Sequence, residues 1–315
     1  GNLTNTEDVL MGLDEKATAL VLNNLVKQYS NPYLAVAREY TSNARDSHKQ
    51  AGVTRPVQVQ LPSDLSPQLV IEDFGLGLSR ERLKLYGQFG ASDKRDSNDQ
   101  IGGFGLGSKS GLTIASQFTV VSVKDEKRNT VIVKRREDGH PLMSFLDEQD
   151  APGVPNGTRV MIPTTERYKY TKAIESNFFI GWEPGSILID GAKPTLPSLH
   201  DPDHFDKLDE FGWRIKQKKS SLGLNNNETY AMVDAVLYTV DLNQVEGLSY
   251  EIRNNFLSEV IIKLDNGEVE IHPSRETLIY DKRTREYITK RVNELIEVGR
   301  RHYQDKIDQA KTIFE

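Results

Sequence analysis

A helical period of apolar residues runs along the chain between Asn31 and Gly52. The apolar positions fall on one arc, which predicts a helix with one face toward a core. The residues on this arc are Tyr33, Val36, Ala37, Tyr40, Ala44 and Ala51. Both ends are signalled, because Asn31 suits an N-cap, Pro32 the first helical position and Gly52 the residue past the end.

Alternating or continuously apolar runs elsewhere in the first part of the chain predict strands, with short helices between them. The strands are expected at 57–61, 68–72, 118–123, 130–134, 158–162 and 186–189. The helices are expected at about 79–88, from Ser108 onward, and at 171–182. Residues 89–107 show little periodicity, which predicts a loop long enough to suggest a function.

A second part of the chain follows residues 194–206, where three prolines and several Asp and His residues predict a linker. A strand is then expected at 231–240, and a hairpin at 260–271 that turns at Asp265-Asn266-Gly267. The whole pattern predicts an α+β protein. Its expected parts are an N-terminal domain at 1–195, a linker at 196–207, a second domain at 208–282 and a long charged helix at 283–315.

The composition is that of a globular protein, since 37% of the 315 residues are hydrophobic and 27% are charged. No apolar run reaches the roughly 20 residues that span a bilayer. The absence of cysteine excludes disulfides and fits a cytoplasmic location. The net charge of −6 argues weakly against a dedicated nucleic-acid binder. Because the chain opens with Gly and its last helix lacks a stop signal, we expect a portion of a longer protein.

Three polar residues of the predicted helix, Glu39, Asn43 and Asp46, occupy positions i, i+4 and i+7. Because about 3.6 residues make one turn, their side chains lie on one face, beside the buried arc. An ordinary surface face would not need a fixed Glu and Asn there, so the spacing suggests a site. The alternative is a solvated face that happens to carry these residues.

A second motif, Asp73-x-Gly75-x-Gly77, follows the strand expected at 68–72. An aspartate at this place can accept a hydrogen bond from an exocyclic amine, which adenine offers and guanine does not at the same edge. The two glycines allow a sharp turn and a close approach of the backbone to a flat ring. The alternative is an ordinary turn at the end of a strand.

A glycine-rich run at residues 102–110 forms the third motif. Its N–H groups, together with the N-terminus of the helix that follows, suit a phosphate group. Two familiar phosphate loops do not fit. The P-loop needs Lys directly after its second glycine, where this chain has Ser108 and places Lys109 one residue late. The dinucleotide fingerprint needs a preceding strand and a third glycine, and the run has neither.

In order and spacing, the three motifs resemble the GHKL ATPase superfamily. This superfamily includes type II topoisomerase ATPase subunits, MutL mismatch-repair proteins, the ninety-kilodalton heat-shock chaperones, MORC proteins and histidine kinases. Gly157-Thr158, before an expected strand, is similar to the superfamily's late Gly-Thr motif. The resemblance implies a Bergerat-type sandwich, with helices on a mixed, mostly antiparallel sheet, that binds ATP and Mg²⁺ and hydrolyses ATP slowly. It also implies a smaller transducer-like α/β domain.

The resemblance implies a role for each matching residue. Glu39 is expected to be the general base for the attacking water, and Asn43 the Mg²⁺ ligand. Asp46 is expected to be a partner near the adenine or the metal. Asp73 is expected to accept the hydrogen bond of the adenine amine, with support from Thr158.

The remaining residues that the resemblance assigns to the nucleotide lie in two loops. They are Gly75, Gly77, Gly102, Gly103, Phe104, Gly105, Leu106, Gly107 and Ser108. Ser92, Lys94 and Lys109 are expected to act at the phosphates, as similar elements of MORC-like members do, and Lys109 is also a candidate catalytic residue. Solvated lysines are the alternative.

Residues 268–278 resemble the Ser-Arg-Glu segment in the middle domain of the heat-shock chaperones, whose Arg reaches the γ-phosphate. Arg275 is therefore a candidate catalytic residue that senses ATP from the second domain, because its planar guanidinium suits phosphate. Lys263 is a weaker rival, and a structural Arg–Glu surface pair is the alternative. Only 38 residues precede Glu39, none of them His, which argues against a histidine kinase.

The helix motif and residues 90–94 and 273–276 also resemble the rIIA protector-from-lysis family of tailed phages, over nearly the whole chain. We expect an ATP-operated clamp that forms an ATP-dependent homodimer, has an unknown protein client and acts in the host cytoplasm if phage-encoded. One alternative is a non-hydrolysing ATP-binding interaction module. Another is a DNA-associated clamp of the MutL or topoisomerase kind, in which Lys216-x-Lys218-Lys219 could line a groove.

Overall fold

The computed structural model describes residues 7–10, 30–86, 107–137, 139–175, 178–272 and 276–313. The chain divides into two compact units. Unit 1 comprises Gly1–Ile174 and Pro184–Pro194, and unit 2 comprises Glu175–Glu183 and Thr195–Glu315. Each unit has its own sheet.

The long helix of unit 1, α2, spans Pro32–Ala51 and has the ends that the sequence predicts. Asn31 is the N-cap, and its side chain accepts a hydrogen bond from the N–H of Leu34 at 3.1 Å. Gly52 follows the helix in the left-handed conformation, with φ of 65°. The predicted core arc is wrong at Ala51, which is exposed like the two residues before it, at the free end of the helix.

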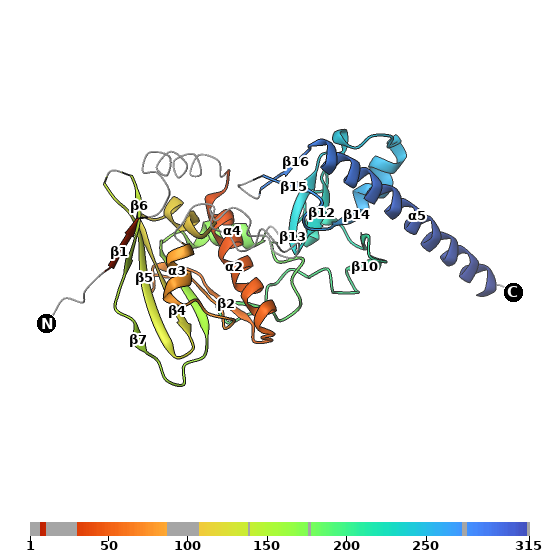
Figure 1. The fold of residues 1–315 in the computed structure, drawn as a ribbon. Coiled ribbons are helices and arrows are strands. Elements are labelled where there is room, and N and C mark those ends of the chain that lie inside the picture. The colour runs from red at the N-terminus through yellow and green to blue at the C-terminus, as the bar shows by residue number, and fades with distance from the viewer. Residues whose placement is uncertain are drawn as a thin grey trace. The chain divides into compact units, whose positions relative to one another are not determined.

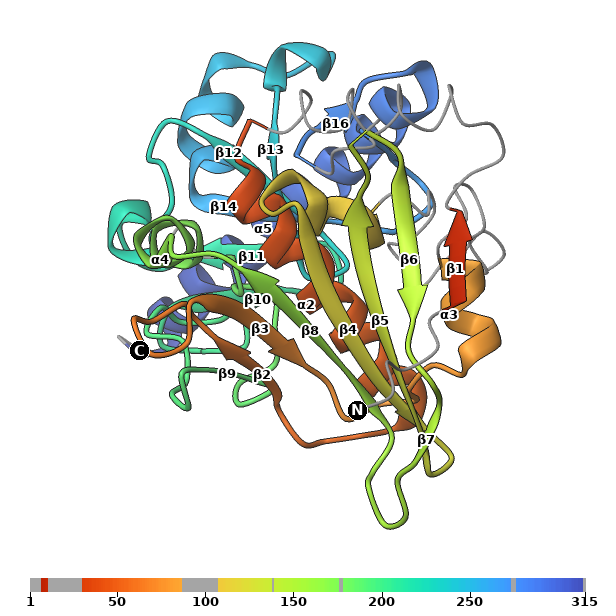
Figure 2. The same ribbon diagram turned by 90° about the vertical axis from the view of Figure 1, so that its left-hand side faces the viewer.

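A nine-stranded sheet forms the body of unit 1 (Figure 1). Its order is β1-β6-β5-β4-β8-β3-β2-β9, with β7 paired to β5, and only β2 and β9 are parallel. The strands are β1 Glu7–Leu10, β2 Val57–Gln60, β3 Gln68–Glu72, β4 Gln117–Lys124, β5 Lys127–Arg135, β6 Pro141–Phe145, β7 Gln149–Asp150, β8 Gly157–Pro163 and β9 Ile187–Ile189. Figure 2 shows α2 crossing one face of this sheet, which confirms the predicted fold class.

Three short helical segments accompany the sheet: α3 Arg80–Tyr86, the 3-10 helix η2 Gly107–Thr113, and α4 Arg167–Glu175. The prediction of a helix at 171–182 is wrong, because α4 begins earlier and ends at Glu175. The Thr164 hydroxyl accepts a hydrogen bond from the N–H of Glu166 at 3.2 Å, so the turn starts before the predicted range. Tyr170 of α4 is buried and meets the ring of Tyr33 edge-on at 5.2 Å.

Unit 2 is built on a five-stranded sheet with the order β10-β11-β14-β12-β13, in which only β12 and β14 are parallel. Its strands are β10 Phe205–Leu208, β11 Gly212–Ile215, β12 Thr229–Val233, β13 Val236–Val240 and β14 Val260–Leu264, with a separate pair β15 Glu270–Ile271 and β16 Leu278–Ile279. Short helical turns lie at η3 Lys219–Leu222, η4 Leu242–Gln244, η5 Ile252–Phe256 and η6 Leu257–Glu259. Strand β10 begins at Phe205, within the residues predicted as a linker.

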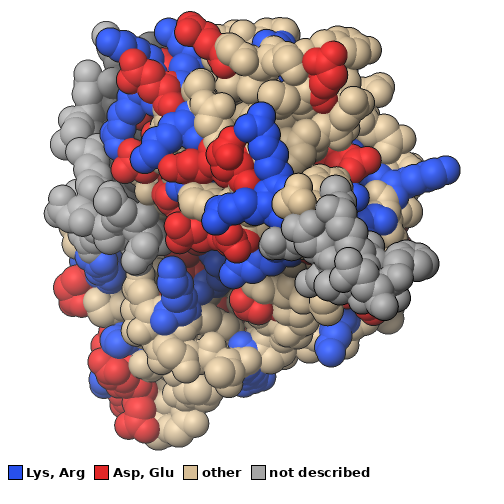
Figure 3. Space-filling model, turned by 90° about the vertical axis from the view of Figure 1, so that its right-hand side faces the viewer, with Lys and Arg blue, Asp and Glu red and all other residues tan. Residues whose placement is uncertain are grey.

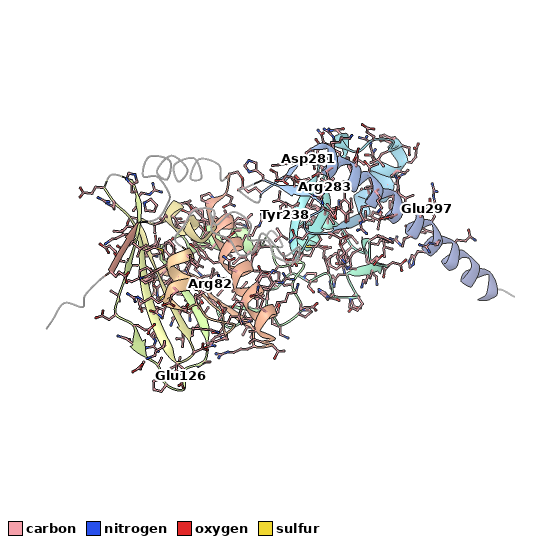
Figure 4. All side chains as sticks on the ribbon, viewed as in Figure 1. Arg82, Glu126, Tyr238, Asp281, Arg283 and Glu297 are labelled. Atoms are coloured by element: carbon pink, nitrogen blue, oxygen red, sulfur yellow. The ribbon has the colours of Figure 1, made fainter. Side chains whose placement is uncertain are left out.

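The helix α5, Lys282–Ile313, packs on β14 and β10 of this sheet. Its buried apolar residues recur at helical spacing and are Ile288, Val292, Leu295 and Val298. Figure 4 labels Arg283 near its start and Glu297 farther along. Although α5 is long, neither it nor any other described helix carries an apolar stretch that could cross a membrane.

The strand predicted at 231–240 is in fact two strands. β12 and β13 form a hairpin that turns at Asp234 and Ala235, where φ is 42° and 67°. The sequence pattern does not reveal this turn because it lacks the glycine that commonly supplies positive φ.

The hairpin predicted at 260–271 is also wrong. β14 lies between β11 and β12, so both of its edges are already paired, and the chain beyond the turn pairs β15 with β16 instead. The turn itself exists, since the N–H of Glu268 donates to the carbonyl of Asp265 at 3.3 Å. The carboxylate of Asp265 binds α5, accepting hydrogen bonds from Tyr287 at 2.6 Å and Arg291 at 2.5 Å.

The N-cap of α2 gives a test of the helix end. Asn31→Ala removes the oxygen that accepts from the N–H of Leu34, so we expect the free energy of unfolding to fall by about 1 kcal/mol. Asn31→Ser keeps an acceptor oxygen, so its free energy of unfolding should fall much less. Urea unfolding followed by circular dichroism measures both. Equal midpoints for the Ala variant and the wild type would exclude the cap as a source of stability.

Candidate functional site

Helix α2 carries the first predicted cluster. Glu39 is 7% exposed and Asp46 5%, while Asn43 is half-buried. One helical turn apart, the Nδ2 of Asn43 donates to the Oε1 of Glu39 at 3.2 Å. The carboxylate and the amide are therefore held together at the edge of the core, which excludes a solvated face for Glu39 and Asp46.

The second cluster is the turn after β3, residues 73–77, which we call the Asp73 loop. Asp73 is 7% exposed, and its Oδ1 accepts hydrogen bonds from the N–H of Gly75 at 2.9 Å and from the Ser47 hydroxyl at 3.2 Å. The Ser47 oxygen also accepts from the N–H of Leu76 at 3.0 Å. Because Ser47 belongs to α2, helix and loop form one packed unit.

Burial sets the electrostatics of this cluster. It raises the pKa of Asp73 from 3.8 to about 6, and the nearby charge of Glu72 acts in the same direction. Hydrogen bonds from Gly75, from Ser47 and from the backbone of Thr158 lower the pKa and oppose this effect. A buried carboxylate is a strong acceptor for a ligand N–H, because little water competes with the ligand.

Close packing explains the glycines of the Asp73 loop. A Cβ on Gly75 would lie 2.2 Å from the Oγ of Ser47, and a Cβ on Gly77 would lie 1.9 Å from the carbonyl oxygen of Val123. On β8, a Cβ on Gly157 would lie 2.2 Å from the carbonyl oxygen of the loop's first residue. Atoms of α2 and β4 thus lie so close to the loop, and the loop so close to β8, that no side chain larger than hydrogen fits at these three glycines.

Ser122 on β4 belongs to the site, although the motifs do not identify it. This buried residue has its Oγ 2.9 Å from the Oγ1 of Thr158, donates to the carbonyl of Gly157 at 3.1 Å and accepts from the N–H of Leu78 at 2.8 Å. The N–H of Asp73 donates to the carbonyl of Thr158 at 2.9 Å. The structure therefore brings the two predicted residues together. The available signal was a lone serine in an otherwise apolar stretch of strand.

Tyr40 connects α2 with the segment after the glycine-rich run. Its hydroxyl accepts a hydrogen bond from the N–H of Gly111 in η2 at 3.1 Å, and its ring meets that of Phe118 at 5.9 Å. The helix η2 starts at Gly107, the last glycine of the predicted phosphate loop. The helical pattern of the sequence places Tyr40 only in the core arc, but its side chain also holds η2 beside α2.

Part of the predicted site lies outside the described residues: Ser92, Lys94, Gly102, Gly103, Phe104, Gly105, Leu106 and Arg275. Gly107, Ser108 and Lys109 form the start of η2, where the backbone alone is described. Lys263, the rival of Arg275, is exposed on β14.

A pair of glycine variants tests the packing of the Asp73 loop. Gly77 and Gly153 have similar φ values, 65° and 71°, but a Cβ on Gly153 would have no neighbour within 4 Å. Both Gly→Ala changes should cost about 1–2 kcal/mol of backbone strain, and Gly77→Ala a further ~1–3 kcal/mol for the clash with β4. Denaturant unfolding measures the difference. Equal losses would show that the loop is not closely packed.

The raised pKa of Asp73 predicts how stability depends on pH. A carboxyl group with a pKa of 3.8 when unfolded and about 6 when folded favours the folded state below pH 3.8, and this contribution is lost as the pH rises through 6. Asp73→Asn removes the titration. Between pH 4 and pH 7 the wild type should therefore lose stability relative to this variant, by about 2 kcal/mol. Parallel thermal melts at several pH values test this, and a difference that does not change with pH would contradict it.

The chain is similar to known proteins in both sequence and fold. Residues 30–143 match the family described as "Histidine kinase-, DNA gyrase B-, and HSP90-like ATPase". An uncharacterized protein of Mycoplasma pneumoniae (strain ATCC 29342 / M129 / Subtype 1) is 28% identical over 143 residues, which cover 44% of this chain and 56% of that protein. The match therefore spans little more than half the length of that relative.

Among solved structures, the ATPase region of Saccharomyces cerevisiae topoisomerase II, bound to ICRF-187 (dexrazoxane), superposes with a TM-score of 0.54. The match covers 86% of this chain and 85% of that chain at 10% identity, so it shows the fold alone. The family match, in turn, contains α2 and the Asp73 loop. The motifs, the family match over residues 30–143 and the fold together support the GHKL superfamily, and a GHKL ATPase domain implies ATP binding.

Proposed function

We propose that this chain is an ATP-operated clamp that binds Mg-ATP, hydrolyses it slowly and dimerises when ATP is bound. The observation that carries the proposal is the arrangement on α2. Asn43 is bonded to the carboxylate of Glu39 at 3.2 Å, and Ser47 of the same helix holds Asp73 at 3.2 Å. A pure binding module needs the Asp73 loop but has no use for a buried carboxylate beside an amide. The pair therefore supports hydrolysis.

In this proposal Glu39 orients the attacking water and takes its proton. Its burial keeps bulk water away from the carboxylate, and the N–H of Asn43 fixes the orientation of the carboxylate. Asp73 accepts the hydrogen bond of the adenine amine, and Ser122 and Thr158 support the loop from the other side. Catalysis then depends on positioning and charge stabilisation, as phosphoryl transfer generally does.

Asn43 fits the part of a Mg²⁺ ligand. Its amide oxygen is a hard donor, and its nitrogen is already bonded to Glu39. Among the described residues, no group of three or more His, Cys, Asp or Glu side chains could hold a metal ion. An ion held here would therefore take further ligands from the nucleotide phosphates and water, which is usual for Mg²⁺, and would neutralise phosphate charge.

The clamp requires coupling between the two units. We assign the contact with the γ-phosphate to Arg275 of unit 2, and the closing lid to residues 102–108 with Ser92, Lys94 and Lys109. A ligand that binds one arrangement of the units better than another shifts the population toward it. The similarity to the rIIA phage family remains a prediction, and two of the three segments that carry it include residues outside those described.

The DNA-associated alternative finds little support in the lysine run. Lys219 is buried and donates to the carbonyl of Glu228, while Lys216 donates to the carbonyl of Pro202 at 2.8 Å and lies 3.5 Å from Asp206. On the face that Figure 3 shows, Lys and Arg are interspersed with Asp and Glu. On the described part of this face, charges of both signs alternate, and it shows no single-sign groove of the kind that binds a phosphate backbone.

Steady-state phosphate release over a wide range of protein concentrations tests the proposal. Glu39→Gln should lower turnover about 100-fold or more while calorimetry shows nearly unchanged ATP affinity, because only the base is lost. Glu166→Gln, on the surface of unit 1, is the matched control and should behave as the wild type. Full turnover in Glu39→Gln would remove Glu39 from its role.

The concentration dependence distinguishes the remaining readings. A specific rate that climbs with protein concentration supports the dimerising clamp, and a constant rate indicates a monomeric ATPase. ATP binding without turnover would instead favour the non-hydrolysing module. Salt-sensitive DNA binding of the ATP-bound form would favour the DNA-associated clamp.

A further inference from the structure

Phe74, the second residue of the Asp73 loop, is contacted by two side chains that no motif includes. The guanidinium carbon of Arg55 lies 3.4 Å from the centroid of the Phe74 ring. The His48 ring lies 6.2 Å from it, tilted by 40°. Arg55 belongs to the turn between α2 and β2, and His48 to the end of α2. Two elements therefore hold one aromatic ring beside Asp73.

His48 also binds the backbone of Phe74. Its Nε2 accepts the N–H of Phe74 at 2.7 Å, so the neutral imidazole carries its proton on Nδ1. His48 is only 7% exposed, and this burial lowers its pKa. The charge of Arg55 lowers the pKa further, while a hydrogen bond to the Arg55 backbone raises it. A neutral imidazole can keep accepting the Phe74 N–H at neutral pH.

Three consecutive residues of the loop each donate a hydrogen bond from the backbone N–H to a side chain. That of Phe74 binds His48, that of Leu76 binds Ser47, and that of the residue between them binds the carboxylate of Asp73. Two of the three acceptors are neighbours on α2. The end of this helix therefore sets the position of the backbone that follows Asp73.

We propose that His48 and Arg55 are positioning residues, which fix the carboxylate of Asp73 for nucleotide binding by holding Phe74. The inference rests on the proposed function, because it takes Asp73 as the group that binds the base. Asp73 and Phe74 share a planar peptide bond, so a shift of the Phe74 N–H reorients the Asp73 main chain and its side chain. Both residues act through Phe74.

A positioning role predicts which properties change when His48 or Arg55 is replaced: nucleotide affinity should fall, and turnover should not. Asp73 is assigned to the base end of the nucleotide, whereas Glu39 and Asn43, on earlier turns of α2, are assigned to the phosphate end. Weaker holding of Phe74 should therefore reduce affinity for ATP and ADP equally. Turnover at saturating ATP should stay the same, because uniform binding is lost rather than transition-state stabilisation.

Variants at position 48 provide the main experiment. His48→Leu removes the acceptor and should weaken ATP and ADP binding about 10-fold in calorimetry, with kcat unchanged within about twofold. His48→Gln retains an acceptor oxygen and should restore affinity to within about threefold of the wild type. Thermal melts confirm that both variants fold.

Arg55→Lys tests the second residue, because lysine cannot stack a planar fork on the ring. We expect a loss of affinity of about threefold, on the order of the 0.5–1 kcal/mol of an exposed cation–π contact. Arg214→Lys is the matched control, since Arg214 belongs to unit 2 and makes the same kind of contact there, 5.2 Å over the ring of Tyr303. If Arg55→Lys and Arg214→Lys lose equal amounts of ATP affinity, Arg55 has no positioning role.

Amide hydrogen exchange at Phe74 without nucleotide separates this inference from the proposed function. Faster exchange in His48→Leu than in His48→Gln supports the hold on the loop. If the Phe74 amide of His48→Leu exchanges as slowly as that of the wild type, the inference is overturned. It is also overturned if exchange is faster in this variant but its ATP affinity equals that of the wild type. If the wild type binds no ATP, the proposed function is wrong, and exchange alone decides whether His48 holds the loop.

Discussion

The packing of the Asp73 loop against the end of α2 is the constraint on which the rest of the site depends. A Cβ at Gly75 would lie 2.2 Å from the Oγ of Ser47, so helix and loop approach as closely as backbone permits. At that distance Ser47 can bond both the carboxylate of Asp73 and the N–H of Leu76. The same closeness excludes water, and this burial raises the pKa of Asp73 to about 6. The close packing of helix and loop is therefore the cause both of the Ser47 hydrogen bonds and of the raised pKa of Asp73.

This constraint makes the site costly for the unliganded protein. A buried carboxylate loses hydration that Gly75 and Ser47 restore only in part, as its raised pKa shows. A ligand N–H placed against Asp73 would supply a further bond and recover part of that cost. Local destabilisation of this kind is common where a protein binds its ligand, because the groups are arranged for the complex rather than for the free state.

The sequence predicts those features whose signals are local. Asn31, Pro32 and Gly52 mark α2 because caps and turns depend on neighbouring residues. Features that depend on distant segments are not predictable in this way: Ser122 meets Thr158 only after β4 and β8 pair. The expected return strand after Asp265 fails for the same reason, since β11 and β12 occupy both edges of β14. The roles assigned to Glu39, Asn43 and Asp73 stay predictions, whereas their burial and contacts are observed.

One rigid element connects the separate parts of the site. Near its start, α2 packs Tyr33 against Tyr170 of α4; at its middle, Tyr40 binds Gly111 of η2. Near its end, Ser47 binds the Asp73 loop. The Asp73 loop, the Glu39 pair and the segment after the glycine-rich run are therefore attached to the same 20-residue helix. A ligand that favours one position of α2 biases all three together, so the parts of the site within unit 1 are coupled through contacts that are already present.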